Sequence, residues 1–240
     1  MTDLVTQVIK QGYISDIRDY KSDIRVVSVR LDLSEKLVFI PGQYVYLLID
    51  GFDPRPYSIA NLPGADVLEF HIRNTGFGLS RHIFEDMKPG DRIGVDGPHG
   101  QALYNAQKTG GDPVLLLAGG LGIAQLRSIL MAALKNHNHV PVTLYWGVEY
   151  PDDLYLADDL KKLVAAHPQF SFIPVIRASD GGGDFRTGTL DTVLQADFEN
   201  GSLHRHHCYV AGPPGMVHAL YPVLLDKGMV PARFYCDLPV

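Results

Sequence analysis

The stretch 114–130, Val-Leu-Leu-Leu-Ala-Gly-Gly-Leu-Gly-Ile-Ala-Gln-Leu-Arg-Ser-Ile-Leu, most constrains the fold of this chain. Its unbroken apolar start is typical of a strand buried on both faces of a parallel sheet. Gly119, Gly120 and Gly122 then break the strand, and apolar residues return at helical spacing. A strand, a glycine turn and a helix start leave free backbone N–H groups at the sheet's carboxyl edge, which suits a phosphate group. The third glycine of the usual dinucleotide fingerprint is replaced by Gln125, so a tight structural turn is the alternative.

The rest of the second half repeats this alternation. Strands are predicted over 142–147, 170–176, 208–211 and 233–236, and helices over 123–136, 152–166, 190–194 and 216–226. Successive βα units predict a doubly wound parallel sheet that binds ligands at its carboxyl edge. Two more glycine turns follow strands, at Gly147 and at Gly212-Pro213-Pro214-Gly215-Met216. We expect all three turns at one edge of the sheet.

The first half has a different pattern, of short strands separated by turns. Strands are predicted over 6–16, 24–33, 44–49, 57–60, 67–73 and 92–96, which suggests an antiparallel Greek-key β-barrel. One short helix is expected over 78–87, with Ser80 as its cap. The polar stretch 101–113 is the best linker candidate. The sequence therefore predicts two domains, 1–105 and 112–240.

Composition excludes several functions. The 240 residues carry 21 Lys and Arg against 27 Asp and Glu, a formal net charge of −6, which argues against nucleic-acid and anionic-membrane partners. No apolar run reaches the ~18 residues of a membrane span, and the N-terminus does not resemble a signal peptide, so we expect a cytoplasmic protein. The two cysteines cannot supply the four thiolates of an iron–sulfur cluster. We expect no metal site, and interpret His204-Arg205-His206-His207 as a solvated loop.

The segment Arg55-Pro56-Tyr57-Ser58 stands out within the first half. Pro56 favours an extended backbone, and strand alternation then directs Arg55 and Tyr57 to one side and Ser58 to the other. The segment thus offers a guanidinium for phosphate, an aromatic face for a planar ring and a hydroxyl for a ring nitrogen. The alternative is a β-edge segment with an exposed arginine and a packed tyrosine.

Together these segments resemble the ferredoxin–NADP reductase superfamily, especially its short NAD(P)H:flavin oxidoreductases and oxygenase reductase components. The matching pieces occur in the family's order and cover nearly the whole chain: Pro41-Gly42-Gln43-Tyr44, Arg55-Pro56-Tyr57-Ser58, Gly97-Pro98-His99-Gly100, Leu117-Ala-Gly-Gly-Leu-Gly122, Tyr145-Trp146-Gly147 and Ala211-Gly212-Pro213-Pro214. The resemblance implies a flavin-binding β-barrel followed by an NAD(P)-binding α/β domain.

The resemblance also implies roles for individual residues. Arg55 and Pro56 would bind the flavin phosphate or ribityl region, and the catalytic pair would be Tyr57, stacked on the flavin, and Ser58, near its N5. The stretch Arg73-Asn-Thr-Gly-Phe-Gly78-Leu-Ser80 looks like the signature that binds the FAD pyrophosphate, and the same flavin site would include His71, Ile72 and Leu79. The nicotinamide nucleotide would be bound by Gly119, Gly120, Gly122, Gly147, Gly212, Pro213 and Met216.

The chain departs from the family at several positions. Leu121 stands where Thr is usual, Gln125 where Pro is usual, and Ala211 where a Cys often precedes the Gly-Pro turn. Leu121 and Gln125 are therefore expected to reshape the nucleotide turn. The tail that contains Tyr235 resembles the aromatic tails that cover the flavin in the family.

The implied reaction is transfer of a hydride from nicotinamide C4 to flavin N5, with FAD or FMN and NADH or NADPH as cofactors. The first hypothesis for the function is a reductase that passes electrons to free flavin. The alternatives are an FAD-bearing reductase that serves a ferredoxin, an oxygenase or a ferric complex, and, more remotely, a non-catalytic nucleotide-binding subunit. The nicotinamide cofactor stays open as well. Glu149 would repel a 2′-phosphate and favours NADH, whereas Arg177 and Ser179 lie where NADPH-binding relatives place phosphate ligands.

Overall fold

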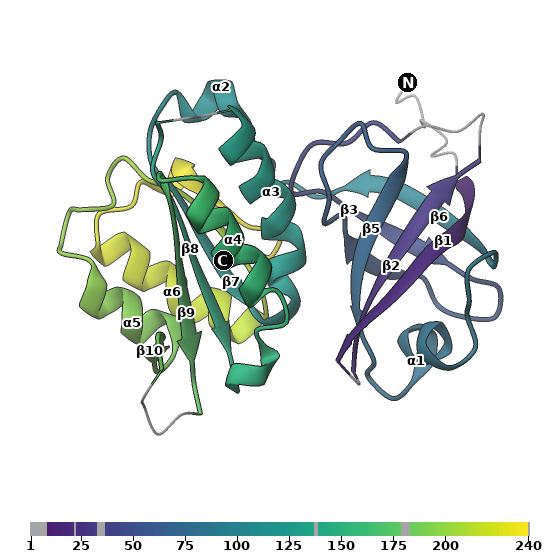
Figure 1. The fold of residues 1–240 in the computed structure, drawn as a ribbon. Coiled ribbons are helices and arrows are strands. Elements are labelled where there is room, and N and C mark those ends of the chain that lie inside the picture. The colour runs from purple at the N-terminus through teal and green to yellow at the C-terminus, as the bar shows by residue number, and fades with distance from the viewer. Residues whose placement is uncertain (1–8, 22, 33–36, 137–138, 179–182, 240) are drawn as a thin grey trace. The chain divides into compact units, whose positions relative to one another are not determined.

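The chain forms two compact units, Met1–Gly100 and Gln101–Val240. The computed structural model describes residues 9–21, 23–32, 37–136, 139–178 and 183–239 (Figure 1). Ser179 lies outside the described residues. Each unit contains one six-stranded sheet. No helix in the described ranges is long and apolar enough to cross a membrane.

The first unit is an antiparallel barrel, as the sequence predicts. Its strands follow the order β4-β3-β6-β1-β2-β5, with the bounds β1 Lys10–Lys21, β2 Ile24–Leu31, β3 Tyr44–Leu48, β4 Arg55–Ser58, β5 Val67–Arg73 and β6 Arg92–His99. Just beyond β4, the Ala60 N–H donates to the Glu69 carbonyl on β5 at 2.8 Å. This bond brings the two ends of the sheet together. Inward-facing apolar residues such as Val27, Val45 and Phe70 fill the interior.

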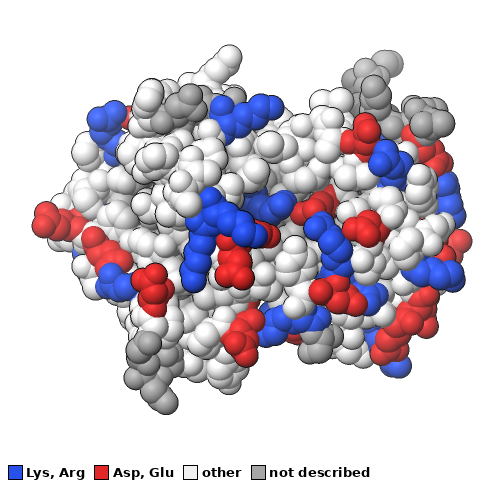
Figure 2. Space-filling model, viewed as in Figure 1, with Lys and Arg blue, Asp and Glu red and all other residues white. Residues whose placement is uncertain are grey.

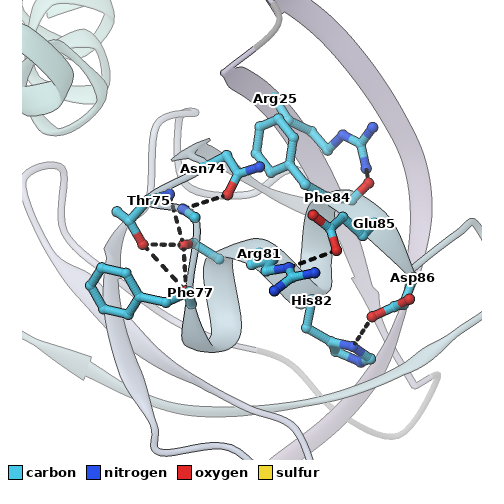
Figure 3. Close-up of polar contacts among 11 residues, drawn as sticks. Arg25, Asn74, Thr75, Phe77, Arg81, His82, Phe84, Glu85 and Asp86 are labelled. Carbon is cyan, nitrogen blue, oxygen red and sulfur yellow. Dashed lines mark hydrogen bonds and ion pairs between the residues drawn. The ribbon is translucent and has the colours of Figure 1, made fainter.

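Helix α1, Gly78–Glu85, is the main helix of this unit. Its N-cap residue is Phe77, so the expectation that Ser80 caps the helix was wrong: Ser80 lies in the first turn. At the other end, the Arg25 guanidinium donates to the Phe84 carbonyl at 3.0 Å (Figure 3) and to the Ile83 carbonyl at 2.9 Å. These bonds satisfy carbonyl groups that the end of a helix leaves without intrahelical partners.

The second unit is the predicted doubly wound parallel sheet. Its strands follow the order β10-β9-β8-β7-β11-β12, with the bounds β7 Val114–Gly119, β8 Val142–Val148, β9 Phe170–Ile176, β10 Arg186–Thr187, β11 His207–Ala211 and β12 Phe234–Tyr235. The chain runs outward from β7 through β8 and β9, then returns to β11 on the other side of β7. The strand order therefore reverses between β7 and β11, the place where sheets of this kind bind ligands.

Helices cover both faces of this sheet (Figure 1). They are α2 Ala106–Thr109, α3 Ile123–Asn136, α4 Ala157–Ala166, α5 Leu190–Asp197 and α6 Pro214–Asp226, with short 3-10 turns η1 Gly120–Gly122, η2 Pro151–Asp153 and η3 Pro231–Arg233. Helices α5 and α6 bury apolar residues such as Val193 and Leu220 against one face, where Leu115 and Leu117 of β7 project. Helices α3 and α4 lie on the opposite face (Figure 1). All six residues of β7 are buried, which explains its unbroken apolar sequence.

Other local predictions also differ from the structure: the strands predicted over 6–16 and 57–60 are shifted, to β1 Lys10–Lys21 and β4 Arg55–Ser58. The expected linker 101–113 contains helix α2, whose first turn is capped by the Asn105 carboxamide oxygen. The helix expected from residue 152 begins at Ala157, because η2 and the non-helical Leu154 precede it. Strand β10 was not predicted, since two exposed residues carry no periodicity.

Candidate functional site

Strand β4 presents the first group of predicted site residues. It pairs with β3 in a register that places Arg55 opposite Leu47 and Ser58 opposite Tyr44. Arg55 is exposed, and within the described part of the chain its guanidinium has no carboxylate partner. The Tyr57 ring packs partly into the barrel core, and burial raises the pKa of its phenol to about 12 against a smaller opposing effect of the Arg55 charge. The strand therefore offers a free cation beside a neutral aromatic ring.

The turn between β5 and α1 forms the second group. Ser80 Oγ accepts from the Thr75 N–H at 3.1 Å and lies 2.7 Å from Thr75 Oγ1 (Figure 3). Gly76 adopts φ +79° and Gly78 φ +58°, and no atom lies within 4 Å of a Cβ placed at either residue. The turn thus leads into the N-terminus of α1 with open space beside its backbone. The positive end of a helix with free N–H groups suits a pyrophosphate.

The remaining predicted flavin residues flank this turn. Arg73, the last residue of β5, lies with its Nε 3.2 Å from a carboxylate oxygen of Asp23. The side chains of His71, Ile72 and Leu79 are buried, and His71 Nε2 lies 3.2 Å from Glu69 Oε1. Any contact from these three residues to a ligand is therefore expected to come from their backbone.

The glycine turn after β7 is shaped by close packing. Gly120 adopts φ +52°, a conformation that favours glycine. A Cβ on Gly122 would collide with the carbonyl oxygen of Ala211 at the end of β11. The Trp146 indole N–H donates to the Gly120 carbonyl at 2.9 Å and holds the turn from the side of β8. Gly119 and Gly122 therefore allow the turn at β7 to meet the end of β11.

Gln125, which replaces the expected third glycine, has a different partner. Its side-chain amide donates to Asp237 Oδ2 at 2.7 Å. The other oxygen of Asp237 accepts from the backbone N–H groups of Gln101 and Ala102, at 2.6 and 2.9 Å. Gln125 thus joins α3 to the C-terminal segment and to the first residues of the second unit.

A pocket of about 420 Å³ lies at the carboxyl edge of the parallel sheet. The predicted residues that line it are Gly119, Gly120, Gly147, Pro213 and Met216. Gly212 packs directly against Gly119, and Gly122 packs against the Ala211 carbonyl and does not line the pocket. The three glycine turns expected at one edge therefore do meet there.

The pocket also contains residues that the sequence did not indicate as site residues. Gly188, Thr189, Leu190 and Asp191 line it from the N-terminus of α5. Their sequence carries a usable signal, because a glycine and a threonine cap precede a helix that follows a strand. Glu149 and Arg177, which the sequence analysis did consider in the choice between NADH and NADPH, also line the pocket, and Arg177 Nη1 lies 3.4 Å from Glu149 Oε2.

Tyr235 lies apart from the pocket. Its ring is buried and stacks on Tyr209 with a centroid distance of 4.4 Å, and its hydroxyl lies 2.9 Å from His207 Nδ1. It pairs with Tyr209, the middle residue of β11, and not with a residue at the carboxyl end of that strand. Because these contacts occupy the ring, we leave Tyr235 out of the proposed site.

The histidine run also has internal partners. His207 is buried beside Tyr235, and His204 Nδ1 lies 2.9 Å from the Gly201 carbonyl oxygen. Among the described residues, no group of three or more His, Cys, Asp or Glu side chains is arranged to hold a metal ion. On the face drawn in Figure 2, acidic and basic side chains are interspersed.

Known proteins match both units. Residues 11–104 match the family model of the oxidoreductase FAD-binding domain, and residues 116–221 match that of the oxidoreductase NAD-binding domain. The chain is 37% identical over 228 residues to the ferredoxin–NAD(P)(+) reductase component of the naphthalene 1,2-dioxygenase system of Pseudomonas putida. That alignment covers 95% of this chain and 68% of the relative.

Two further proteins to which the chain is similar are also reductases. The chain is 32% identical to the ferredoxin–NAD(P)(+) reductase component of naphthalene 1,2-dioxygenase/salicylate 5-hydroxylase systems of a Ralstonia species, over 95% of this chain and 68% of that protein. The crystal structure of an Amycolatopsis cytochrome P450 reductase superimposes with a TM-score of 0.87 at 30% identity, covering 99% of this chain and 72% of that one. The chain thus spans roughly two thirds of the length of these relatives.

Proposed function

Because the chain belongs to the ferredoxin–NADP reductase superfamily, we propose that it passes electrons from NAD(P)H to a protein acceptor, a ferredoxin or an oxygenase component. Membership makes the chain an oxidoreductase with an FAD-binding domain and an NAD-binding domain, as the sequence analysis expected. The protein acceptor is our choice between the two electron-transfer hypotheses. It is supported by the 37% identity to a reductase component named for ferredoxin.

The residues of the barrel fit a bound FAD. The unpaired guanidinium of Arg55 is free to bind a phosphate oxygen, and the turn before α1 leaves open space beside Gly76 and Gly78 for the pyrophosphate. The partly exposed face of Tyr57 would support the flavin ring, since the phenol stays neutral at physiological pH. The Ser58 hydroxyl, half-buried on the same strand, would donate a hydrogen bond to the ring.

The pocket of the parallel sheet fits the nicotinamide nucleotide. The backbone N–H groups that open η1 and α3 would bind its pyrophosphate, while Pro213 and Met216 would contact the nicotinamide half. When bound, FAD supplies an acceptor for the nicotinamide hydride and releases electrons singly to a one-electron partner. The residues of the chain contribute orientation and exclusion of water rather than acid–base chemistry.

The single observation that carries this proposal is that one chain contains both an oxidoreductase FAD-binding domain and an oxidoreductase NAD-binding domain. The test is to purify the protein and measure bound flavin, then follow NADH-dependent reduction of a dioxygenase-type ferredoxin and, separately, of free FMN. We expect yellow protein with one FAD per chain that reduces ferredoxin faster than FMN. Colourless protein that oxidises NADH only after flavin is added would instead indicate a free-flavin reductase. If the protein oxidises NAD(P)H with neither ferredoxin nor added flavin, the hypothesis of a non-catalytic nucleotide-binding subunit would be favoured.

Two substitutions on β4 test the flavin site. Removing the cation in Arg55→Ala is expected to raise the Kd for FAD about 10- to 100-fold, the loss typical of one charge-assisted hydrogen bond. Ser58→Ala is expected to slow single-turnover flavin reduction about tenfold with FAD still bound. Arg92→Ala, which removes an exposed arginine on β6, serves as the control. Unchanged FAD affinity and reduction rate in both variants would refute the assignment.

A further inference from the structure

We infer that Asp237 and Gln125 are positioning residues for hydride transfer, because they hold the start of the second unit to the helix that follows the nucleotide turn. The inference rests on the proposed function and deepens it. It gives a role in the reaction to two residues that do not line the nucleotide pocket.

The place where the chain passes from one unit to the other is the first argument. The first unit ends at Gly100 and the second begins at Gln101. The proposed flavin residues belong to the first unit, and the nucleotide pocket belongs to the second. Hydride transfer requires the two rings at contact distance and in a fixed orientation. The reaction therefore depends on how firmly the chain is held at this junction.

The Asp237 carboxylate holds the first two residues of the second unit. Its Oδ1 accepts from the backbone N–H groups of Gln101 and Ala102, at 2.6 and 2.9 Å. The Gln101 side-chain amide also donates to the Cys236 carbonyl at 3.3 Å. In the part of the chain that the structure describes, no other group accepts from these two backbone N–H groups. Loss of the carboxylate would therefore release the junction.

Gln125 connects the same carboxylate to α3. Its side-chain amide donates to Asp237 Oδ2 at 2.7 Å, and the residue is only 7% exposed. Gln125 lies in the first turn of α3, directly after η1, where the pyrophosphate is proposed to bind. Its helix neighbours Ile123 and Leu126 are fully buried, so packing keeps α3 in place without this bond. The junction is then the part that gains freedom when the bonds to Asp237 are broken.

The chemistry of these bonds allows the two side chains to be exchanged. All donors to Asp237 are neutral N–H groups, and within the described ranges no cation pairs with it. A carboxylate at position 125 would face the Asp237 carboxylate, and the like charges would repel. An amide at position 237 would restore the bond with donor and acceptor exchanged, while its oxygen still accepts from the backbone.

The experiment combines two measurements on the FAD-loaded protein: hydrogen exchange of the Gln101 and Ala102 backbone N–H groups, and the single-turnover rate of flavin reduction at saturating NADH. In Asp237→Ala and in Gln125→Glu, we expect exchange about tenfold faster and flavin reduction about tenfold slower. In Gln125→Glu combined with Asp237→Asn, both should return to within about twofold of the wild type, because the bond forms again.

Binding separates a positioning role from damage to the pocket. Isothermal titration of Asp237→Ala with ADP-ribose should give a Kd within about threefold of the wild-type value, since the residues that line the pocket are unchanged. Gln195→Glu is the matched control. It adds the same charge at an exposed residue of α5 outside the pocket, and should alter neither exchange at the junction nor flavin reduction.

The inference is overturned if the double variant stays as slow as Gln125→Glu, or if exchange accelerates while flavin reduction keeps its wild-type rate. It is also overturned if Asp237→Ala loses affinity for ADP-ribose in proportion to its loss of rate, because the residue would then act through binding. A wild-type protein that shows no NADH-dependent flavin reduction would refute the proposed function itself, and that outcome is recognised before any variant is made.

Discussion

At the scale of single residues, the nucleotide turn depends on two glycines for different reasons. Gly120 is required for its backbone conformation, with φ +52° and open space around it. Gly122 is required for space, because the Ala211 carbonyl occupies the place of a side chain. A turn built in this way fixes the distance between β7 and β11 at the reversal of strand order.

Gly122→Ala is therefore expected to lower the free energy of unfolding by about 2–3 kcal/mol, since backbone must move to admit the methyl group. Gly120→Ala should cost about 1–2 kcal/mol through its left-handed conformation. Denaturant unfolding followed by circular dichroism measures both. Gly215→Ala is the control, because no atom lies within 4 Å of the added Cβ and the residue is helical. Equal stability of Gly122→Ala and Gly215→Ala would contradict the packing argument.

The sequence marks these glycines but cannot say what approaches them. Ala211 contacts Gly122 only because β11 returns beside β7, and that pairing depends on the fold of everything between the two strands. The sequence likewise marks Gln125 as unusual but does not indicate which residue it contacts. The sequence predicts that it reshapes the turn, whereas its partner is Asp237 near the far end of the chain. The local sequence pattern thus identifies a residue with a structural role, but the contacts that define this role come from residues far away in the chain.

At the scale of elements, α1 is held at both ends by residues from other parts of the chain. The Thr75–Ser80 bonds fix its start, and the Arg25 guanidinium from β2 satisfies its last carbonyls. Two nitrogens of the same guanidinium bind the Asp19 carboxylate, and the group also stacks over the Phe84 ring at 4.7 Å. One arginine thus ties α1 to the barrel wall.

Arg25→Ala is expected to destabilise the barrel by about 1–2 kcal/mol, because two helix carbonyls lose a charged donor. The measurement is the midpoint of thermal or urea unfolding. Arg81→Ala removes an exposed arginine from the same helix, where it pairs with Glu85 four residues on, and should have a smaller effect. If the two variants lost equal stability, the bonds from Arg25 to the helix carbonyls would contribute nothing beyond an exposed ion pair.

Element prediction succeeds where periodicity is strong. The strand over 67–73 and the start of β2 agree with the structure, because alternation and turn residues define them. It fails where an element is short or is interrupted by its surroundings, as with α2, β10 and the break at Leu154. The site follows the same rule: the glycine turns after strands and the threonine cap before α5 are visible in the sequence, but only the assembled sheet shows that they line one pocket.

At the scale of the whole molecule, buried histidines couple folding to pH. Burial lowers the pKa of His207 below its usual value of 6.5, and the positive charge of Arg233 acts in the same direction. His207 Nδ1 faces the Tyr235 hydroxyl, while Nε2 is buried and has no hydrogen-bond partner among the described residues. Burial lowers the pKa of His206 as well.

Stability is therefore expected to fall on acidification below about pH 6.5, because the unfolded chain takes up protons that folded His206 and His207 resist. Unfolding midpoints between pH 7.5 and 5.5 would measure the slope. His207→Gln should flatten this profile, and the exposed His139→Gln should not. An unchanged slope in His207→Gln would show that another group titrates.

The central place of β7 also bears on how the chain is made. Its partner β8 follows soon in synthesis, but β11, which pairs residue by residue from His207 opposite Val114, emerges only after β8, β9 and β10. Until then one edge of a wholly apolar strand lacks its backbone partners. Such an edge is a template for pairing with another chain. A nascent polypeptide halted before β11 would therefore be prone to aggregate, and synthesis of β11 removes that hazard.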